Sequence, residues 1–220
     1  MTDKNLFRGL LLLAAFVIWT ALVMIVDVKA IGPKGSAVGL ALLNCWFHQL
    51  TGVHMELYTI TDCLGLVPVA VCIGFGVLGL TQWIKRRSLH QVDRDIILLG
   101  VYFVIVIAGY LLFEMIPINY RPILIEGRLE ASYPSSTTLL VLSVMPALVF
   151  QVQQRAKNRG FKVAVIVVII VFTAFMVVGR LLSGVHWLTD IAGGVLLSSS
   201  LFYLYKGGVS TWNSMKNYKN

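Results

Sequence analysis

The sequence predicts an all-α integral membrane protein, a six-transmembrane helix bundle with short interfacial helices. Hydrophobic residues fill 58% of the 220 positions and charged residues only 13%, whereas a soluble domain has a charged share of about a quarter. The mean hydropathy is correspondingly high, at +0.83. The apolar residues are also gathered into long runs, as required of helices that cross a bilayer with a rise of about 1.5 Å per residue.

Polar and basic segments separate these runs into six spans within a single domain, residues 1–220. The first run, residues 9–26, exceeds the roughly 7 to 15 residues of a signal-peptide core, so we expect it to be retained. The segment from there to residue 56 suits a loop with a short interfacial helix. Asp62 is either a helix cap or a polar contact within the bundle, and we expect the cap. The other spans are predicted near residues 57–84, 95–116, 137–152, 163–178 and 188–205.

The distribution of basic residues predicts the orientation of the spans. With the N-terminus in the cytoplasm, thirteen of the 18 Lys and Arg residues fall on the cytoplasmic side, in agreement with the positive-inside rule. We therefore expect a bacterial cytoplasmic membrane protein with both termini inside. This topology also explains the formal charge of +8, so nucleic acid is not an expected partner. The basic residues left on the outer side are Lys29, Lys34, Arg121, Arg128 and Arg180.

A polar segment between the last two spans contains Arg180, His186 and Asp190. If the chain is helical from Trp187 onward, the carboxylate lies one turn from the imidazole and can hold one nitrogen while the other stays free. Such a pair prepares a histidine nucleophile or base, and the guanidinium suits a phosphate. The alternative is a structural loop in which the arginine snorkels and the His–Asp pair is inert. Three such groups at one membrane boundary favour a functional site.

The loop between the third and fourth spans is the second candidate region. It carries Arg121 and Arg128, and it ends in Pro134-Ser135-Ser136-Thr137, where the fourth span begins. Free N–H groups and hydroxyls at a helix N-terminus attract phosphate, although capping alone would also explain the two serines. Helix packing that brings this loop against the segment between the last two spans would create an anion pocket on the outer side.

No metal ion or cofactor is expected. Cys45, Cys63 and Cys72 are odd in number and lack the spacing of a metal site, so we interpret them as unpaired. His48 and His54 have no carboxylate at a helical offset, which favours packing at the membrane interface. The chain also lacks a Gly-rich nucleotide loop.

Three motifs in the second half of the chain resemble those of the type 2 phosphatidic acid phosphatases, the PAP2 family of membrane lipid phosphatases. The family has a Lys separated by six residues from Arg-Pro, then Pro-Ser-Gly-His, then Ser-Arg, five residues, His, three residues and Asp. The third motif matches at Arg180, His186 and Asp190, with Gly179 at the Ser position. The motif-bearing region is 114–190.

The first two motifs match in part. Arg121-Pro122 is present, but Glu114 stands at the Lys position. The second motif begins with Pro134-Ser135 and has Ser136 and Thr137 at the Gly and His positions. Glu114 cannot supply positive charge, and Thr137 cannot act as the general acid that the histidine of the family provides.

The resemblance implies a role for each matching residue. His186 attacks phosphorus to form a phosphohistidine, and Asp190 orients its ring. No metal takes part. Arg121, Arg180 and Ser135 bind the phosphoryl oxygens. Apart from the resemblance, Ser136 at the helix N-terminus is a further phosphate-binding candidate, and so is Arg128 in the same loop.

The expected function is removal of phosphate from a lipid phosphate or diphosphate, so the expected partners are a lipid substrate and the membrane. The alternatives are a lipid phosphotransferase that uses the same histidine and a catalytically weak lipid-phosphate-binding protein. A transporter is disfavoured because the spans carry almost no ionisable residues at mid-membrane. Nothing in the sequence specifies an oligomeric state.

The loss of a general acid at Thr137 bears on the substrate. A phosphomonoester such as phosphatidate expels an alkoxide, which needs a proton, whereas a lipid diphosphate expels a phosphate that can leave largely unprotonated. We therefore expect a polyprenyl diphosphate to be preferred over phosphatidate, unless Glu126 or Glu130 replaces the acid.

Overall fold

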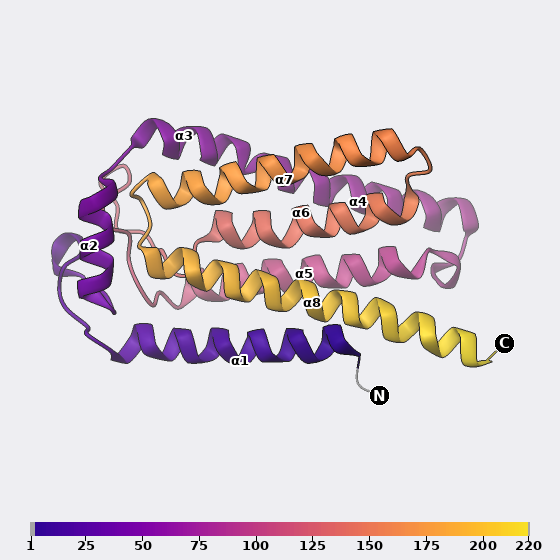
Figure 1. The fold of residues 1–220 in the computed structure, drawn as a ribbon, viewed down its shortest axis with the longest axis horizontal. Coiled ribbons are helices and arrows are strands. Elements are labelled where there is room, and N and C mark those ends of the chain that lie inside the picture. The colour runs from indigo at the N-terminus through magenta and orange to yellow at the C-terminus, as the bar shows by residue number, and fades with distance from the viewer. Residues whose placement is uncertain (1–2, 220) are drawn as a thin grey trace.

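The protein, described by a computed structural model over residues 3–219, is a bundle of α-helices (Figure 1). Two short 3₁₀ turns, Pro33–Gly35 and Leu89–Gln91, lie in the connections. The helices are α1 (Lys4–Ile25), α2 (Ala41–Thr51), α3 (Met55–Leu64), α4 (Leu66–Arg86), α5 (Arg94–Met115), α6 (Ser136–Arg155), α7 (Arg159–Leu182) and α8 (Leu188–Lys219).

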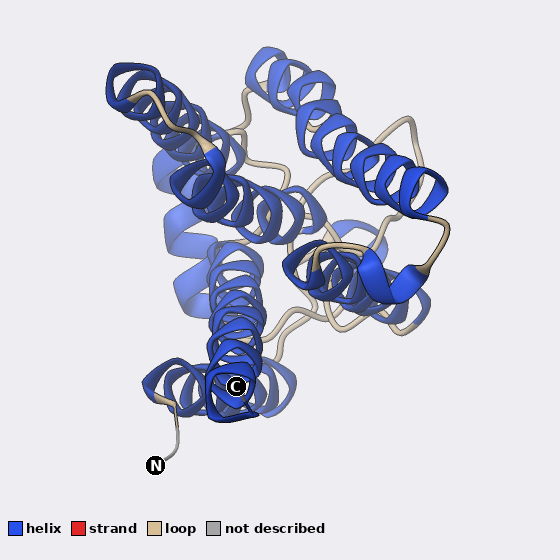
Figure 2. Cartoon of the chain, turned by 90° about the vertical axis from the view of Figure 1, so that its right-hand side faces the viewer, coloured by secondary structure: helices blue, strands red, loops and turns tan. Residues whose placement is uncertain are grey.

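Six helical segments of the described chain are long and apolar enough to cross a membrane, which confirms the predicted fold class. Five of the six begin one to five residues before the predicted runs, because polar residues such as Lys4 and Arg159 form the first turn. The even number of crossings leaves both termini at the same end of the bundle (Figures 1 and 2). Helix α2 lies across the other end, as the interfacial helix expected there.

The N- and C-terminal helices pack along each other in Figure 1. Glycines allow this approach: a Cβ at Gly9 would lie 2.9 Å from the backbone nitrogen of Leu204, and one at Gly207 2.8 Å from that of Leu6. Small residues at helix contacts let two backbones come close inside a bilayer. A buried core of α1, α5, α6 and α8 residues, including Phe16, Leu99 and Val144, fills the space beside this pair.

The second span differs from the prediction because it consists of two helices, α3 and α4, that meet at Gly65. Pro68 explains the break, since proline has no N–H to offer the carbonyl four residues earlier and its ring clashes with that carbonyl. The expected role of Asp62 as a helix cap is wrong. Asp62 lies inside α3 and contacts α7, where it accepts a hydrogen bond from Arg180.

The end of the bundle nearest the termini is held by an ion-pair cluster. Arg155 at the end of α6 lies 2.6 Å from Asp95 and 3.2 Å from Asp93, and Arg86 lies 2.8 Å from Asp93. These pairs join the α4–α5 connection to the last turn of α6. The opposite end, beside α2, carries the long α5–α6 loop and the α7–α8 link, which are the two regions that the sequence singled out.

Candidate active site

His186 lies in the five-residue link between α7 and α8 and is only 3% exposed. Its position depends on Gly184, which has a φ of +71°, a backbone conformation that favours glycine. A Cβ at Gly184 would lie 2.1 Å from the carbonyl oxygen of Gly52, so the link lies directly against the α2–α3 connection. The N–H of His54 completes this contact by donating to the carbonyl of Ser183 at 2.9 Å.

The carboxylate of Asp190 lies on the Nδ1 side of the imidazole. Asp190 is in the first turn of α8 and is fully buried, with Oδ2 3.6 Å from Nδ1 of His186. Oδ2 also accepts the backbone N–H of Trp187 at 2.9 Å, and Oδ1 accepts the side-chain amide of Asn119 at 3.4 Å. These two donors fix the carboxylate, so the one-turn spacing expected from the sequence places it where it can orient the imidazole.

The other imidazole nitrogen faces an arginine. Nη1 of Arg121 lies 3.4 Å from Nε2 of His186. Because a guanidinium only donates, this contact assigns the lone pair to Nε2 and the proton to Nδ1. Burial is the main cause that lowers the pKa of His186, to about 4, and the charges of Arg121 and Arg180 lower it further while Asp190 opposes them. The imidazole is therefore neutral at neutral pH, with Nε2 unprotonated.

Arg121 comes from the α5–α6 loop, which folds back on itself beside the link. The backbone N–H of Arg121 donates to the carbonyl of Glu130 at 3.0 Å, and the backbones of Tyr120 and Ala131 form a bridge. The guanidinium Nε lies 3.0 Å from Oε2 of Glu130. Glu130 was considered above as a replacement acid, and it instead pairs with a phosphate-binding candidate.

Arg180 reaches the site from the last turn of α7 and is 1% exposed. Its Nη2 donates to Oδ1 of Asp62 at 2.7 Å and to Oγ1 of Thr137 at 2.6 Å. Nε and Nη1 have no hydrogen-bond partner within residues 3–219. The ring of Tyr58 lies under both arginines, 4.9 Å from the guanidinium carbon of Arg180 and 5.9 Å from that of Arg121. One aromatic ring thus supports both cationic groups.

The start of α6 has a structural role and also forms a wall of the site. Ser135 is the N-cap, and its Oγ accepts from the backbone and the hydroxyl of Thr138 at 3.5 and 3.1 Å. Its own N–H donates to the carbonyl of Asp190 at 3.0 Å, which ties α6 to α8. The capping alternative therefore describes Ser135 as it stands in the structure. Ser136 and Thr137 are only partly buried and border the cavities described next.

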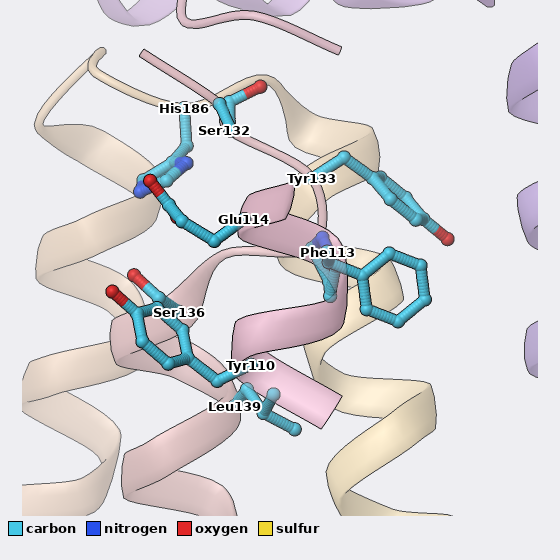
Figure 3. A pocket seen from close by; sticks show the side chains of 10 residues that line it. Tyr110, Phe113, Glu114, Ser132, Tyr133, Ser136, Leu139 and His186 are labelled. Atoms are coloured by element: carbon cyan, nitrogen blue, oxygen red, sulfur yellow. The ribbon is translucent and has the colours of Figure 1, made fainter. Parts of the chain in front are cut away.

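A cavity of about 10 Å³ adjoins His186 (Figure 3), enough for about one water molecule. Glu114 lines it, and Figure 3 shows the carboxylate turned toward the imidazole. Arg128, by contrast, is exposed in the turn of the α5–α6 loop and has no side-chain hydrogen bond or ion pair with any residue from 3 to 219. Arg128 is the candidate that the fold does not bring into the site.

A larger cavity, about 510 Å³, runs from the site along α4, α5 and α6. Asp62, Ser136 and Thr137 line its polar end, and the rest of its wall is mainly apolar. Tyr110 and Ser136 line both cavities, so the two share a wall. The site therefore combines a polar centre at the end of the bundle with an apolar space that extends between the helices.

The sequence motifs assign no site role to three residues of this centre. Tyr58 and Asp62 lie one turn apart in the second span, and Asn119 lies in the α5–α6 loop without a motif of its own. An aspartate within an apolar span was the available signal, since ionisable residues in membrane helices commonly mark functional sites.

The fold and the site define an integral membrane protein with a buried histidine–arginine centre at one end of a helix bundle. Residues 113–214 match the PAP2 superfamily, and all of the motif residues from Glu114 to Asp190 lie inside the match, which supports membership of this superfamily. The match also supports a lipid phosphatase at the family level.

A solved structure has the same fold: the first transmembrane PAP2 type phosphatidylglycerolphosphate phosphatase from Bacillus subtilis. It is 19% identical to this chain, with a TM-score of 0.64, and the alignment covers 93% of this chain and 97% of that one. The search of curated proteins found no match.

Proposed function

We propose that this protein hydrolyses the terminal phosphate of a lipid phosphate or diphosphate through a phosphohistidine on Nε2 of His186. The observation that carries the proposal is the pair of contacts on the imidazole, with Asp190 3.6 Å from Nδ1 and Arg121 3.4 Å from Nε2. The first favours the tautomer that leaves Nε2 unprotonated, and the second places positive charge where the phosphoryl group must arrive. The guanidinium of Arg180 supplies a second charge, with two unpartnered donors.

The chemistry needs two displacements at phosphorus. Nε2 attacks the terminal phosphorus while the bond to the lipid-side oxygen breaks, and water then displaces the histidine to release inorganic phosphate. Asp190 stabilises the positive charge that the imidazole acquires on attack. Arg121 and Arg180 bind the phosphoryl oxygens, with Ser136 at the start of α6 as an additional donor.

The lipid tail is assigned to the apolar cavity along α4, α5 and α6. This cavity, about 510 Å³, begins at Ser136 and Thr137 and continues between membrane-spanning helices. A substrate that lies there carries its leaving oxygen past Thr137. The Thr137 hydroxyl accepts from Arg180 and has no proton to supply at neutral pH. This favours the diphosphate, whose leaving group departs largely unprotonated.

The site is proposed to face the outer side of the membrane. Both termini, together with the basic residues at the end of α4 and in the α6–α7 connection, lie at the opposite end of the bundle. The positive-inside rule assigns that end to the cytoplasm.

The test is turnover of lipids labelled in the terminal phosphate by the protein purified in detergent. The panel contains phosphatidate, phosphatidylglycerophosphate and polyprenyl diphosphate, the second because the solved neighbour is named for it. We expect phosphate release that is lost in His186→Ala. The matched control is His90→Ala, an exposed histidine in the α4–α5 connection, which should keep full activity.

The labelled intermediate separates the candidate functions. Label trapped on His186 together with phosphate release indicates a phosphatase, whereas label without release indicates a phosphotransferase. Wild-type turnover in His186→Ala would reject the proposed mechanism. Absence of both label and release with the entire panel would leave a binding protein.

A further inference from the structure

The contact between Asp62 and Arg180 occupies the donor that a bound phosphate would most need. A guanidinium binds an oxyanion bidentately through Nη2 together with either Nε or Nη1, so Nη2 belongs to both forks. Here Nη2 donates to Asp62 and to Thr137 at 2.7 and 2.6 Å, which uses both of its hydrogens. The unpartnered donors, Nε and Nη1, cannot form a fork with each other. A phosphate can therefore bind bidentately only after one of the two acceptors leaves Nη2.

Asp62 is the acceptor that can leave. Its side chain is 58% exposed, and it lies three residues before the Gly65 break between α3 and α4. Thr137, in contrast, is in the first turn of α6, next to the capped end of the helix. The cavity beside His186, about 10 Å³, holds no more than about one water molecule, so entry of a phosphate also requires side chains to move.

Arg180 needs a counter-ion whenever no phosphate is bound. Its side chain is 2% exposed, and an unpaired charge at such a position is strongly destabilising. Asp62 is the carboxylate in contact with it. A dianionic phosphate would supply the same compensation, so the two anions are alternatives for one guanidinium.

From this geometry we infer that Asp62 is an exchangeable counter-ion of Arg180, which substrate phosphate displaces and which returns to expel the product phosphate. This role rests on the proposed function, because it takes the Arg180 centre as the site of the transferred phosphate. Asp62 is a positioning residue in this cycle: it acts through Arg180 and forms no bond to the substrate.

The test measures binding of inorganic phosphate by isothermal titration calorimetry, in detergent and in a buffer free of other oxyanions. Asp62→Asn keeps the size and the acceptor oxygen but removes the competing charge, so the Kd for phosphate should fall about tenfold. This is the low end of the change in an equilibrium constant that a neighbouring charge causes, about one pKa unit. The Ki of phosphate as a product inhibitor should fall in the same ratio. Asp62→Glu keeps the charge and should bind phosphate about as the wild type does.

Two further variants secure the interpretation. Asp95→Asn removes a carboxylate from an arginine pair of similar length, 2.6 Å, at the opposite end of the bundle, and it should leave the Kd unchanged. Asp62→Ser also removes the charge and should also bind phosphate more tightly than the wild type. It provides the test if the Asn variant does not fold. Variants are purified in phosphate, which replaces the missing counter-ion, and are then dialysed.

The outcomes distinguish this inference from the proposed function. Unchanged or weaker phosphate binding in Asp62→Asn and Asp62→Ser overturns the counter-ion role, because Asp62 would then merely hold Arg180 in place. In that case wild-type turnover and binding persist, and the proposed function stands. If the wild type neither binds phosphate nor turns over any of the lipids, the proposed function is overturned, and the counter-ion role with it.

Discussion

Lowering the pH should destabilise the wild-type protein through His186 by an amount that follows from its burial. The pKa of this residue is lowered from 6.5 to about 4 in the folded protein. Between these values the unfolded chain binds a proton that the folded protein excludes, so stability is highest above pH 6.5 and is lost as the pH falls toward 4.

The magnitude follows from linkage. Each pKa unit corresponds to about 1.4 kcal/mol, so the difference between 6.5 and about 4 is worth roughly 3 kcal/mol in total. Between about pH 7 and about pH 4.5, most of this is lost, roughly 2.5 kcal/mol. His186→Gln does not titrate, so its unfolding free energy should lack this part of the pH dependence while keeping the part due to the carboxylates.

The assay is unfolding in mixed detergent micelles, followed by tryptophan fluorescence, for wild type and His186→Gln at both pH values. The difference between the two pH dependences isolates His186. Identical pH dependences would show that the histidine titrates as in an unfolded chain. If the wild type instead gains stability on acidification relative to the variant, the imidazole is charged and paired with Asp190 in the folded protein. That result would refute the conclusion that His186 is neutral.

Three further results are expected. Asp190→Asn should lower kcat by about 10⁴, as in a comparable His–Asp pair in which the Asn stabilises the wrong imidazole tautomer. A decrease of less than tenfold in kcat would show that Asp190 does not orient the imidazole. Thr137→His should raise kcat/KM for phosphatidate by at least about 10² relative to the diphosphate, and an equal effect on both substrates would show that another group supplies the proton. Arg128→Cys, without the native cysteines, should react with an impermeant thiol reagent in intact cells, whereas labelling only after lysis would invert the topology. Arg128 suits this experiment because it is exposed, whereas Asn119 in the same loop is 1% exposed and its side-chain amide donates to Asp190.

The six spans could be read from the sequence because membrane insertion depends on local composition. An apolar run of sufficient length forms a helix in lipid whatever its neighbours are, since its backbone polar groups must be satisfied within the segment. The pairing of His186 with Asp190 was accessible for a similar reason, because a separation of four residues places two side chains on one face of a helical turn. The break at Gly65 was also encoded locally, in Pro68, although the prediction treated the span as one helix.

The rest of the site depends on contacts between residues far apart in the chain. Arg121 and His186 are 65 residues apart, Asn119 and Asp190 are 71, and Asp62 and Arg180 are 118. No local pattern specifies such pairs, because they follow from how α3, α6, α7 and the α5–α6 loop pack at one end of the bundle. Motif spacing indicated that Arg180 would bind an anion. Only the tertiary structure decided that the anion in contact with Arg180 is the carboxylate of Asp62, because burial of the guanidinium requires a counter-ion and α3 is the helix that supplies it.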